Sequence, residues 1–573
     1  KEIRELLKKN KKYPLMKQIK QILTQIISSL FDVPKNFAVD VTPAPELESK
    51  SDFRADYSTN CALKLAGILH KNPKEIAEVL TAEFLKTAPQ KLPELEGIRT
   101  EIAGPGFVNF MLPDAYFATE IAKLHANFDE NISCDEYSGK SVVTEFSDPN
   151  PFKVLHIGHL YTSIMGESIS KLLEFAGAKV HRVNFGGDVG LHVAKTLYAL
   201  EKKHLANFTI EDIATAYVEG TRAYEEDEEA KQEIVKLNKE IYQISAENLH
   251  DSQLAKDYWH GRELSYAYFD DFYDKLGVKF EKYYPESSVA NLGLNTVKSH
   301  PEVYEESDGA LVFKGEPYDL HTRVFVNREG LPTYEAKDVG LLFQKDADYH
   351  FDESVVITGN DIIDYMKVVL KSVEQYAPDL VEKTIHITHG NVRLPGNQKM
   401  SSRKGNFIKA VDILNEIEEK AENKIIADAA IKYSLLKYKI GNNIEFSIDD
   451  SISLTGNSGP YLQYSAVRAN KILQSISKTN SSLKNYHFNN HELVLIKSFI
   501  NYKEILRDAV HDKAPHLICT YLFDLAQTFS RFYETCRVKG DEKEAERACL
   551  VEIFAKTMSH GLALLGINVP EEM

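Results

Sequence analysis

A strand, a helix and a second strand that follow one another closely limit the fold more than any other feature of this chain. The run "SVVTEF" (141–146) has the β-branched, apolar character of a buried strand. An amphipathic helical stretch (156–177) and the strand-like run "AKVHRVNF" (178–185) come next. This order is typical of a parallel sheet. Two later runs, "SVVITG" (354–359) and "KTIHITHG" (383–390), predict further strands, so we expect an α/β domain with a Rossmann-like parallel sheet.

The chain is long enough for several domains. It has 573 residues, whereas a common domain has about 100 to 150. Before about residue 130, helical stretches alternate with the short strands "IRTEIAG" and "GFVNFML"; after about residue 410, the patterns are helical. The predicted parts are an α+β domain at 1–130, the parallel-sheet domain at 140–410 with a mostly helical insertion at about 195–300, a connecting helical region at 411–450, and an all-α bundle at 451–573. Because the first methionine is Met16, we expect residues 1–15 to be a tag remnant or an extension.

Composition argues against several classes of protein. The net charge of −17 disfavours a general nucleic-acid coating protein, which has to neutralise phosphates over its whole surface. No apolar run is long enough to span a membrane, and no signal-peptide pattern opens the chain, so we expect a cytoplasmic protein without a membrane partner. The five cysteines lack C-x-x-C spacing, which indicates buried free thiols and no structural zinc.

The turn after the first strand of the sheet carries the sequence "HIGH" (156–159). Ligands of such sheets bind beyond the carboxyl ends of the strands, where the N-terminus of a helix favours phosphate. Gly158 leaves room for a nucleotide close to the backbone, while His156 and His159 place two donors on one side of a first helical turn. Such a pair suits the charge that develops on a phosphate. The alternative is that both histidines only cap and pack the start of a helix.

A second segment, "NQKMSSRKGN" (397–406), suits the same ligand. It follows the predicted strand at 383–390 and ends on a glycine. Its cations and hydroxyls, which would suit a pyrophosphate, are Lys399, Arg403, Lys404, Ser401 and Ser402. Taken alone, this loop could equally be a solvated basic turn. Together with the histidine turn, in the right order on one sheet, it favours a nucleotide site.

The two segments together resemble the "HIGH" and "KMSKS" signatures of class I aminoacyl-tRNA synthetases, and their surroundings resemble the arginyl-tRNA synthetases. The resemblance runs nearly end to end. It rests on the runs "FRADYSTNCAL", "GPGFVNF", "EFSDPN", "GNSGPYLQYSAVR", "FSRFYETCRV" and "LALLGINVPEEM". It implies a class I catalytic domain, an N-terminal additional domain that touches the outer corner of tRNA, and a helical anticodon-binding domain.

The implied reaction consumes ATP, with Mg²⁺, to attach L-arginine to tRNA through an arginyl-adenylate. Phosphoryl chemistry of this kind needs positioned donors and charge more than a nucleophile. The resemblance implies that ATP is bound by the residues of the two signatures: His156, Gly158, His159, Lys399, Met400, Ser401, Ser402 and Arg403. The loop has Ser402 where many class I enzymes have a lysine, and Lys153, just before "HIGH", supplies the missing charge. We therefore predict that His156, His159, Lys153 and Lys399 are catalytic.

Arginine needs carboxylates that match its five-donor guanidinium. Tyr334 and Asp338 lie four residues apart, which places them on one helix face. The resemblance implies that this pair binds the guanidinium and that Glu145 and Asn150 also bind the amino acid. Without the resemblance, Tyr334 and Asp338 would more readily be an amphipathic surface pair. Two positions depart from the family: Tyr161 stands where arginine is common, and only Asn360 or Asp361 is available near the place of the family's glutamine or histidine.

An acidic protein that binds tRNA has to concentrate its cations and aromatic rings locally. The C-terminal helices offer Tyr461, Tyr464, Arg468 and Arg537 for this purpose, and the resemblance implies a monomer. Two rival functions stay open. One is an adenylate-forming enzyme for another amino acid on the same sheet, and the other is a tRNA-binding protein without catalysis.

Overall fold

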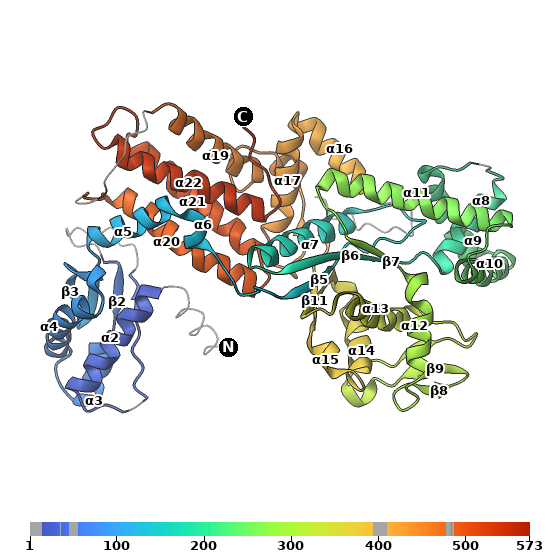
Figure 1. The fold of residues 1–573 in the computed structure, drawn as a ribbon, viewed down its shortest axis with the longest axis horizontal. Coiled ribbons are helices and arrows are strands. Elements are labelled where there is room, and N and C mark those ends of the chain that lie inside the picture. Colours follow the sequence, from blue (N-terminus) through green and yellow to red (C-terminus); the bar gives the residue numbers. More distant parts are fainter. Residues whose placement is uncertain are drawn as a thin grey trace. The chain divides into compact units, whose positions relative to one another are not determined.

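The computed structural model describes residues 14–34, 36–44, 55–205, 207–393, 409–476, 483 and 486–573. The chain divides into two compact units, coloured by sequence in Figure 1. One unit takes the chain up to Ser133, Ala466–Asp508 and Tyr521–Met558. The other takes Cys134–Ser465, Ala509–Thr520 and Ser559–Met573.

The first unit opens with an α+β fold, as predicted. Its antiparallel sheet has the order β1-β2-β4-β3. The strands are β1 (Thr42–Pro43), β2 (Tyr57–Thr59), β3 (Arg99–Ala103) and β4 (Phe107–Met111). The helices are α2 (Pro14–Leu30), α3 (Cys61–Leu69), α4 (Pro73–Lys91), α5 (Asp114–Ala126) and α6 (Phe128–Ile132). Helix α4 begins at Pro73 because Asn72 accepts a hydrogen bond from the Lys74 N–H at 2.9 Å.

The second unit contains the predicted parallel sheet, in the order β12-β11-β5-β6-β7. Its strands are β5 (Ser141–Glu145), β6 (Lys179–Gly186), β7 (Lys282–Pro285), β11 (Glu353–Gly359) and β12 (Thr384–His389). Glu145, the last residue of β5, pairs with Val183 on one side and Val356 on the other. The chain order reverses between β5 and β11, and ligands of doubly wound sheets bind at the carboxyl edge of such a reversal.

Two helices cover opposite faces of this sheet. Thr144 meets Ser170 of α7 (Ile157–Phe175) at 2.8 Å, whereas its neighbour Glu145 pairs with Lys345 of α13 (Tyr334–Tyr349). Because successive strand residues point to opposite faces, α7 and α13 lie on opposite sides of β5. Figure 1 shows the labelled strands β5 and β6 between these two helices.

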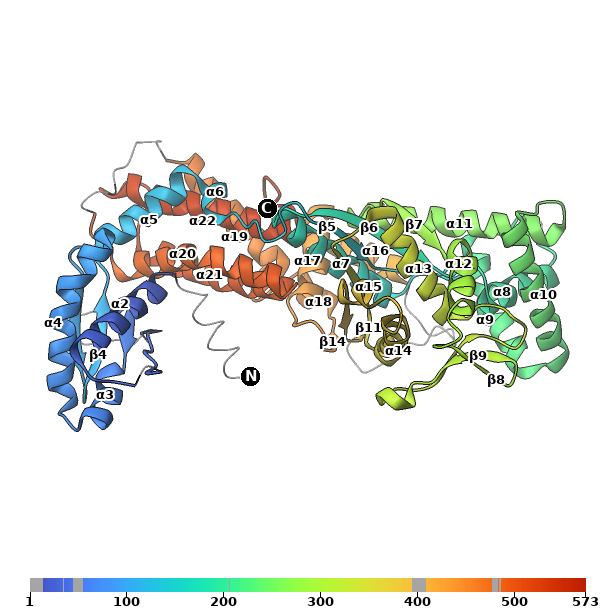
Figure 2. The ribbon, with the colours of Figure 1, turned by 60° about the horizontal axis from the view of Figure 1, so that its bottom comes forward.

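The predicted insertion is helical for most of its length. It consists of α8 (Leu191–Lys202), α9 (Ile210–Glu226), α10 (Glu228–Glu247), α11 (Gln253–Leu276) and α12 (Glu286–Lys298). Figure 2 shows α8, α9 and α10 packed together. One part of the prediction needs correction, because β7 lies inside the range 195–300 and extends the parallel sheet next to β6.

Two small sheets were not predicted. An antiparallel sheet, β10-β9-β8, precedes α13, and β13 pairs with β14 in parallel. Their bounds are β8 (Glu305–Ser307), β9 (Ala310–Phe313), β10 (Arg323–Val326), β13 (Val392–Arg393) and β14 (Ile444–Glu445). The region 411–450 is therefore not wholly helical, because buried Ile444 pairs with Val392.

The remaining helices follow β11 and fill the C-terminal part of the chain. They are α14 (Ile363–Glu374), α15 (Pro378–Glu382), α16 (Ala410–Ala421), α17 (Lys424–Leu436), α18 (Ile448–Ser451), α19 (Gly459–Gln474), α20 (Asn490–His511), α21 (Pro515–Thr535) and α22 (Glu544–Leu564). Within the described ranges, none of the helices combines the length and the apolar character that crossing a membrane requires.

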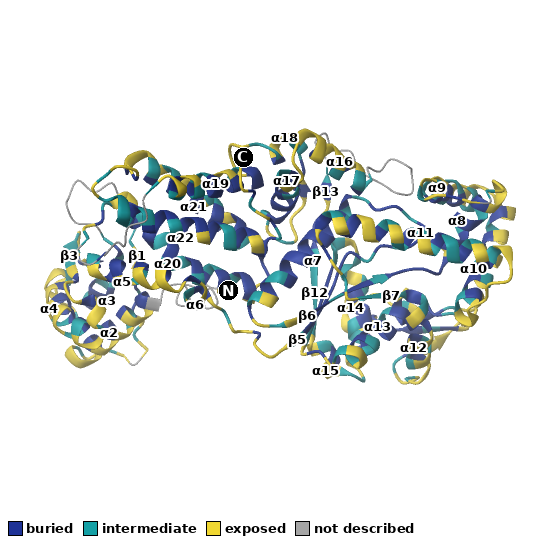
Figure 3. Cartoon of the chain, turned by 45° about the horizontal axis from the view of Figure 1, so that its top comes forward, coloured by how far each residue is buried: buried dark blue, intermediate teal, exposed yellow. Residues whose placement is uncertain are grey.

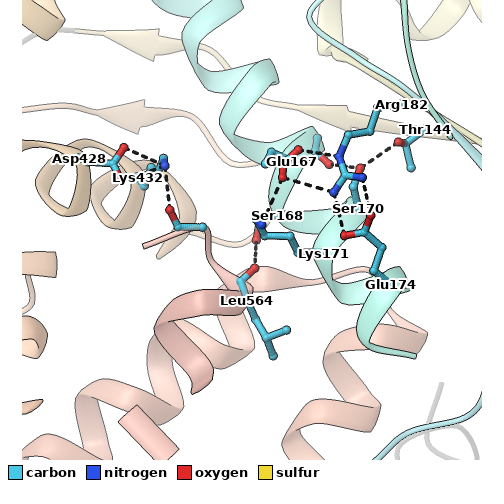
Figure 4. Close-up of polar contacts among 12 residues, drawn as sticks. Thr144, Glu167, Ser168, Ser170, Lys171, Glu174, Arg182, Asp428, Lys432 and Leu564 are labelled. Atoms are coloured by element: carbon cyan, nitrogen blue, oxygen red, sulfur yellow. Dashed lines mark hydrogen bonds and ion pairs between the residues drawn. The ribbon is translucent and has the colours of Figure 1, made fainter. Parts of the chain in front are cut away.

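Helix α7 is buried along most of its length (Figure 3). Polar contacts hold it to distant parts of the second unit, as Figure 4 shows. Ser168 of α7 donates to the Leu564 carbonyl at 3.3 Å, and Lys432 of α17 donates to the Gly566 carbonyl at 2.7 Å. The C-terminal segment after α22 is thereby attached both to α7 and to α17.

Candidate active site

The histidine turn forms the N-terminus of α7. Nδ1 of His156 accepts the Gly158 N–H at 3.0 Å, and Nδ1 of His159 accepts the His156 N–H at 3.1 Å. A ring nitrogen that accepts a hydrogen bond carries no proton, so each neutral ring carries its proton on Nε2. Within the described ranges, neither Nε2 has a partner. The turn therefore presents two N–H donors at the carboxyl edge of the sheet.

Gly158 is required by the ring beside it. A Cβ atom at this position would lie 2.7 Å from Cε1 and 2.9 Å from Nδ1 of His156. The two histidine rings themselves lie with their centroids 4.0 Å apart. The glycine thus makes room for the capping ring, a physical reason different from the close nucleotide approach expected from the sequence.

Both histidines are held neutral. Burial lowers the pKa of His156, and it lowers the pKa of His159 further below its usual value. The nearby charge of Lys153 adds to both effects. Lys153 lies over the ring of Tyr217 from α9, 5.1 Å from its centroid. A positive charge and two neutral donors thus gather at one turn.

The predicted loop residues Lys399, Met400, Ser401, Ser402 and Arg403 lie outside the described residues, but both flanks of the loop are described. After it, Lys409 forms an antiparallel bridge with His156, and Ala410 donates to the Leu155 carbonyl at 2.9 Å. Before it, β12 ends at His389, whose Nε2 lies 2.7 Å from Oγ1 of Thr162 in α7. The chain therefore passes beside α7 at His389, four residues before the described range ends, and re-enters that range beside the histidine turn.

Asp338 and Tyr334 lie at the N-terminal end of α13. Tyr365 of α14 donates a hydrogen bond to Oδ2 of Asp338. Burial raises the pKa of Asp338 to about 8, and the neighbouring Glu145, Glu286 and Glu335 contribute. Tyr334 is 51% exposed as a residue, so a ligand can reach it.

Glu145 and Asn150 are both engaged within the protein. Glu145 forms an ion pair with Lys345, and both side chains are buried. Oδ1 of Asn150 accepts the Gly187 N–H at 2.7 Å, which leaves its Nδ2 donors for another partner. The carboxylate of Glu145 is therefore already balanced by a protein cation.

The two positions considered after β11 differ in their surroundings. Nδ2 of Asn360 donates to the Gly441 carbonyl at 3.3 Å. Asp361 is exposed, and its charge raises the pKa of His156 against the larger effect of burial. Of these two residues, Asp361 is the one whose charge acts on the histidine turn.

The predicted tRNA-binding residues are placed on and near the C-terminal helices. Tyr461, Tyr464 and Arg468 follow one another on α19, and Tyr464 is 41% exposed. The guanidinium of Arg468 lies over the ring of Tyr533, 4.4 Å from its centroid. Nε of Arg537 donates to the Lys539 carbonyl at 3.0 Å. Within the described part of the chain, no group of three or more His, Cys, Asp or Glu side chains is arranged to hold a metal ion.

Comparison with known proteins identifies the family. The model described as "tRNA synthetases class I (R), catalytic domain" matches residues 124–439, more than half of the chain. The chain belongs to the class I arginyl-tRNA synthetases. Two further models, "Arginyl tRNA synthetase N terminal domain" and "DALR anticodon binding domain", match residues 17–112 and 462–573. This confirms the enzyme class expected from the sequence: an ATP-binding synthetase that aminoacylates tRNA with arginine in protein synthesis.

Curated relatives and solved structures agree with the assignment to the synthetase family. The chain is 27% identical to the arginine–tRNA ligase of Pseudoalteromonas atlantica, over 94% of this chain and 97% of that protein. It is 28% identical to the arginine–tRNA ligase of Clostridium perfringens, over 93% and 96%. The fold matches the arginyl-tRNA synthetases of Thermus thermophilus and Plasmodium falciparum with TM-scores of 0.71 and 0.72, both at 22% identity. These matches cover 98% of this chain and 100% and 99% of the two solved chains.

Four residues of this region were not among the site residues predicted from the sequence. They are Asp148, Lys345, Tyr365 and His389. Asp148 lies in the run "EFSDPN" that carries the resemblance, and Tyr365 follows Asn360 and Asp361 by four or five residues, so their nearness in sequence to predicted positions was a signal. No local signal pointed to Lys345, because its pairing with Glu145 joins positions 200 residues apart.

Proposed function

We propose that this synthetase activates L-arginine as an arginyl-adenylate with the histidine turn of α7 as its phosphate-binding element. In this step the arginine carboxylate attacks the α-phosphorus of ATP, the new O–P bond forms, and pyrophosphate leaves. A ribose hydroxyl at the end of tRNA, the 2′-OH in class I enzymes, then attacks the carbonyl carbon of the adenylate; the ester bond forms, the hydroxyl loses its proton, and AMP leaves. The observation that carries the proposal is the pair of Nε2–H donors of His156 and His159 at the carboxyl edge of the sheet.

His156 and His159 would donate to the oxygens on the α-phosphorus, where negative charge builds in the transition state. Gly158 keeps the first ring in place, and Lys153 adds positive charge at the same turn. Lys399, with Met400, Ser401, Ser402 and Arg403, would bind the leaving pyrophosphate. The described flanks of that loop lie beside His156 and Thr162, which supports this role.

The amino acid would bind between α13 and the end of β5. Asp338 and Tyr334 would take the guanidinium, since Asp338 has no cation partner among the described residues and Tyr334 is open. Asn150 would use its Nδ2 donors for the carboxylate of arginine. Glu145 would contribute through its buried pair with Lys345.

For tRNA, we propose that residues 451–573 bind the anticodon region and that residues 1–130 touch the outer corner, while residues 140–410 catalyse. Tyr461 and Tyr464 would stack on unpaired bases, and Arg468 and Arg537 would meet phosphates. The net charge of −17 makes such local cations necessary. We propose further that the enzyme acts as a cytoplasmic monomer and that Mg²⁺ enters with ATP, held by phosphate oxygens and water more than by protein carboxylates.

The test is charging of total tRNA with each of the twenty amino acids. Arginine alone should be accepted by the wild type. His159→Ala should lower kcat at least about hundredfold with its fold preserved, because a transition-state donor is lost. Asp338→Ala should raise the KM for arginine by a similar factor.

Each rival predicts a different result. A synthetase for another amino acid would charge that amino acid in place of arginine. A binding protein without catalysis would retain tRNA in a filter assay and charge it with none. Unchanged kinetics of His159→Ala would remove the histidine turn from the mechanism.

A further inference from the structure

The loop between β6 and α8 contacts the proposed amino-acid site through Gly187. The Gly187 N–H donates to Oδ1 of Asn150 at 2.7 Å, and the Gly187 carbonyl accepts a hydrogen bond from Nε2 of His192 at 2.7 Å. A Cβ atom at Gly187 would lie 2.8 Å from that Asn150 oxygen and 3.0 Å from Oε1 of Glu286, so a side chain here would push the Asn150 amide away. Gly187 therefore connects His192 to Asn150, the proposed ligand of the arginine carboxylate.

The Gly187 N–H decides which end of the Asn150 amide faces the protein. The oxygen and nitrogen of an amide have nearly the same shape, but a backbone N–H can only donate, so it selects the oxygen. The Nδ2 end of the amide, which carries two donors, then remains for a ligand. Because an ionised carboxylate can only accept hydrogen bonds, this orientation of Asn150 is the one that suits it.

The backbone around Gly187 needs to be held in place. It belongs to the run "GGDVG" (186–190), and glycine has more accessible conformations than any other residue. Next in the chain, the buried carboxylate of Asp188 accepts the Ser287 N–H at 2.9 Å and Nε–H of Arg262 at 3.0 Å. These contacts attach the loop to α12 and α11, while the Gly187 carbonyl has a separate partner in α8.

That partner is His192, whose two ring nitrogens differ in their surroundings. Nε2 carries the proton, because a carbonyl oxygen can only accept, and Nδ1 is buried without a partner among the residues that the structure describes. Burial lowers the pKa of His192 well below its usual value, and the charge of Lys153 adds to this effect, so the ring is neutral. A buried acceptor without a donor costs free energy that an apolar side chain would avoid. What the ring contributes is therefore its contact with Gly187.

We infer that His192 is a positioning residue: through Gly187 it holds the amide of Asn150 in the orientation that receives the arginine carboxylate. This inference rests on the proposed function of the site. Without the Nε2–H donor, the Gly187 backbone is free to turn and its N–H leaves the Asn150 oxygen. The amide then rotates and presents that oxygen to the carboxylate, which repels it.

The test is His192→Leu in the whole enzyme. Leucine fills the site but lacks the donor, so the KM for arginine should rise about tenfold. Agmatine, which is arginine without its carboxylate, should inhibit charging by the wild type and by the variant with constants that agree within about twofold. A general distortion of the pocket would weaken both ligands.

Two further substitutions of His192 separate its donor from its polarity. His192→Gln should restore the wild-type KM, because its amide nitrogen reaches about as far as Nε2. The amide of His192→Asn is too short for the Gly187 carbonyl, so this variant should behave like the leucine variant and takes its place if leucine impairs folding. His321→Leu, at an exposed histidine just before β10, is the control and should leave both constants unchanged.

Asn150→Ala supplies the reference for a double-mutant cycle. It should raise the KM for arginine at least as much as His192→Leu does, and the double variant should differ from it by less than about twofold, because both substitutions remove one contact. Additive effects, a wild-type KM in folded His192→Leu, or an equal loss of agmatine binding overturn the inference. An unchanged KM in Asn150→Ala, or no arginine charging by the wild type, would instead overturn the proposed function on which the inference rests.

Discussion

At the scale of single residues, the balance of charge between α13 and the end of β5 carries the proposed selection of arginine. Three carboxylates of this region are each paired with one cation. The pairs are Glu145 with Lys345, Glu286 with Lys337, and Glu335 with Arg323. Burial of an ionised group is costly unless it is paired. Asp338 has no cation partner among the described residues, so below its raised pKa it keeps its proton until a cation binds beside it. Its protonation is therefore linked to the binding of arginine.

This linkage predicts that arginine binds more tightly as the pH rises. Burial raises the pKa of Asp338 to about 8; the hydrogen bond from Tyr365 lowers it, while the charges of Glu145, Glu286 and Glu335 raise it. A bound guanidinium lowers that pKa, so binding releases a proton below about pH 8. Affinity should rise by up to about tenfold per unit between about pH 6.5 and 8, and level off above. The pKa values of His156 and His159 lie below their usual value, so neither ring contributes in this window.

Calorimetry in two buffers with different heats of ionisation counts the protons released. Wild type should release up to about one proton per arginine near neutral pH. Asp338→Asn should bind arginine weakly at every pH and release fewer protons. A pH-independent affinity in the wild type would show that Asp338 is ionised in the empty enzyme, contrary to this account.

At the scale of elements, the longer strands and helices could be predicted from the sequence. Runs of β-branched residues predict four strands of the parallel sheet, β5, β6, β11 and β12, and "HIGH" predicts the start of α7. Short elements were missed: β7 has four residues inside a helical region, and β13 and β14 have two each. Such strands carry no periodicity, because pairing with a distant neighbour is what forms them. The cap that the His156 ring forms on α7 was predicted only as an alternative to phosphate binding, since histidine is not a usual capping residue.

Gly158→Ala tests this cap. The new Cβ would collide with the ring of His156, so the ring has to turn away and its Nε2–H donor moves. We expect kcat to fall about hundredfold, since a displacement of about 1 Å costs that much. Stability should change little, because alanine favours a helix over glycine by about 1 kcal/mol and offsets the lost cap.

Gly67→Ala is the matched control. Gly67 lies in α3, and a Cβ there meets nothing within 4 Å. The substitution should preserve kcat and keep or raise the melting temperature. Full activity of Gly158→Ala would mean that the position of the His156 ring does not matter for catalysis.

At the scale of the whole molecule, segments far apart in the chain complete the unit that carries the site. Helix α7 contacts the C-terminal segment through Ser168, and α17 contacts it through Lys432 (Figure 4). Lys432 also pairs with Asp428 at 2.8 Å, and both side chains are largely buried. The contacts of Ser168 and Lys432 with the C-terminal segment join positions more than 100 residues apart, so no local sequence pattern predicts them.

Lys432→Met is expected to weaken this unit without touching substrate. It removes the partner of Asp428, whose pKa burial already raises, and it leaves the Gly566 carbonyl without this donor. Loss of a buried partner costs about 2 to 3 kcal/mol, so the midpoint of heat inactivation should fall by several degrees.

Lys420→Met is the control, because Lys420 pairs with exposed Glu416 and Asp449, and it should leave the midpoint unchanged. Charging activity below the inactivation temperature should be nearly normal in both variants. Equal midpoints for the two variants would mean that the C-terminal segment is held by its buried apolar side chains, Leu565 and Ile567, and that the lysine adds nothing.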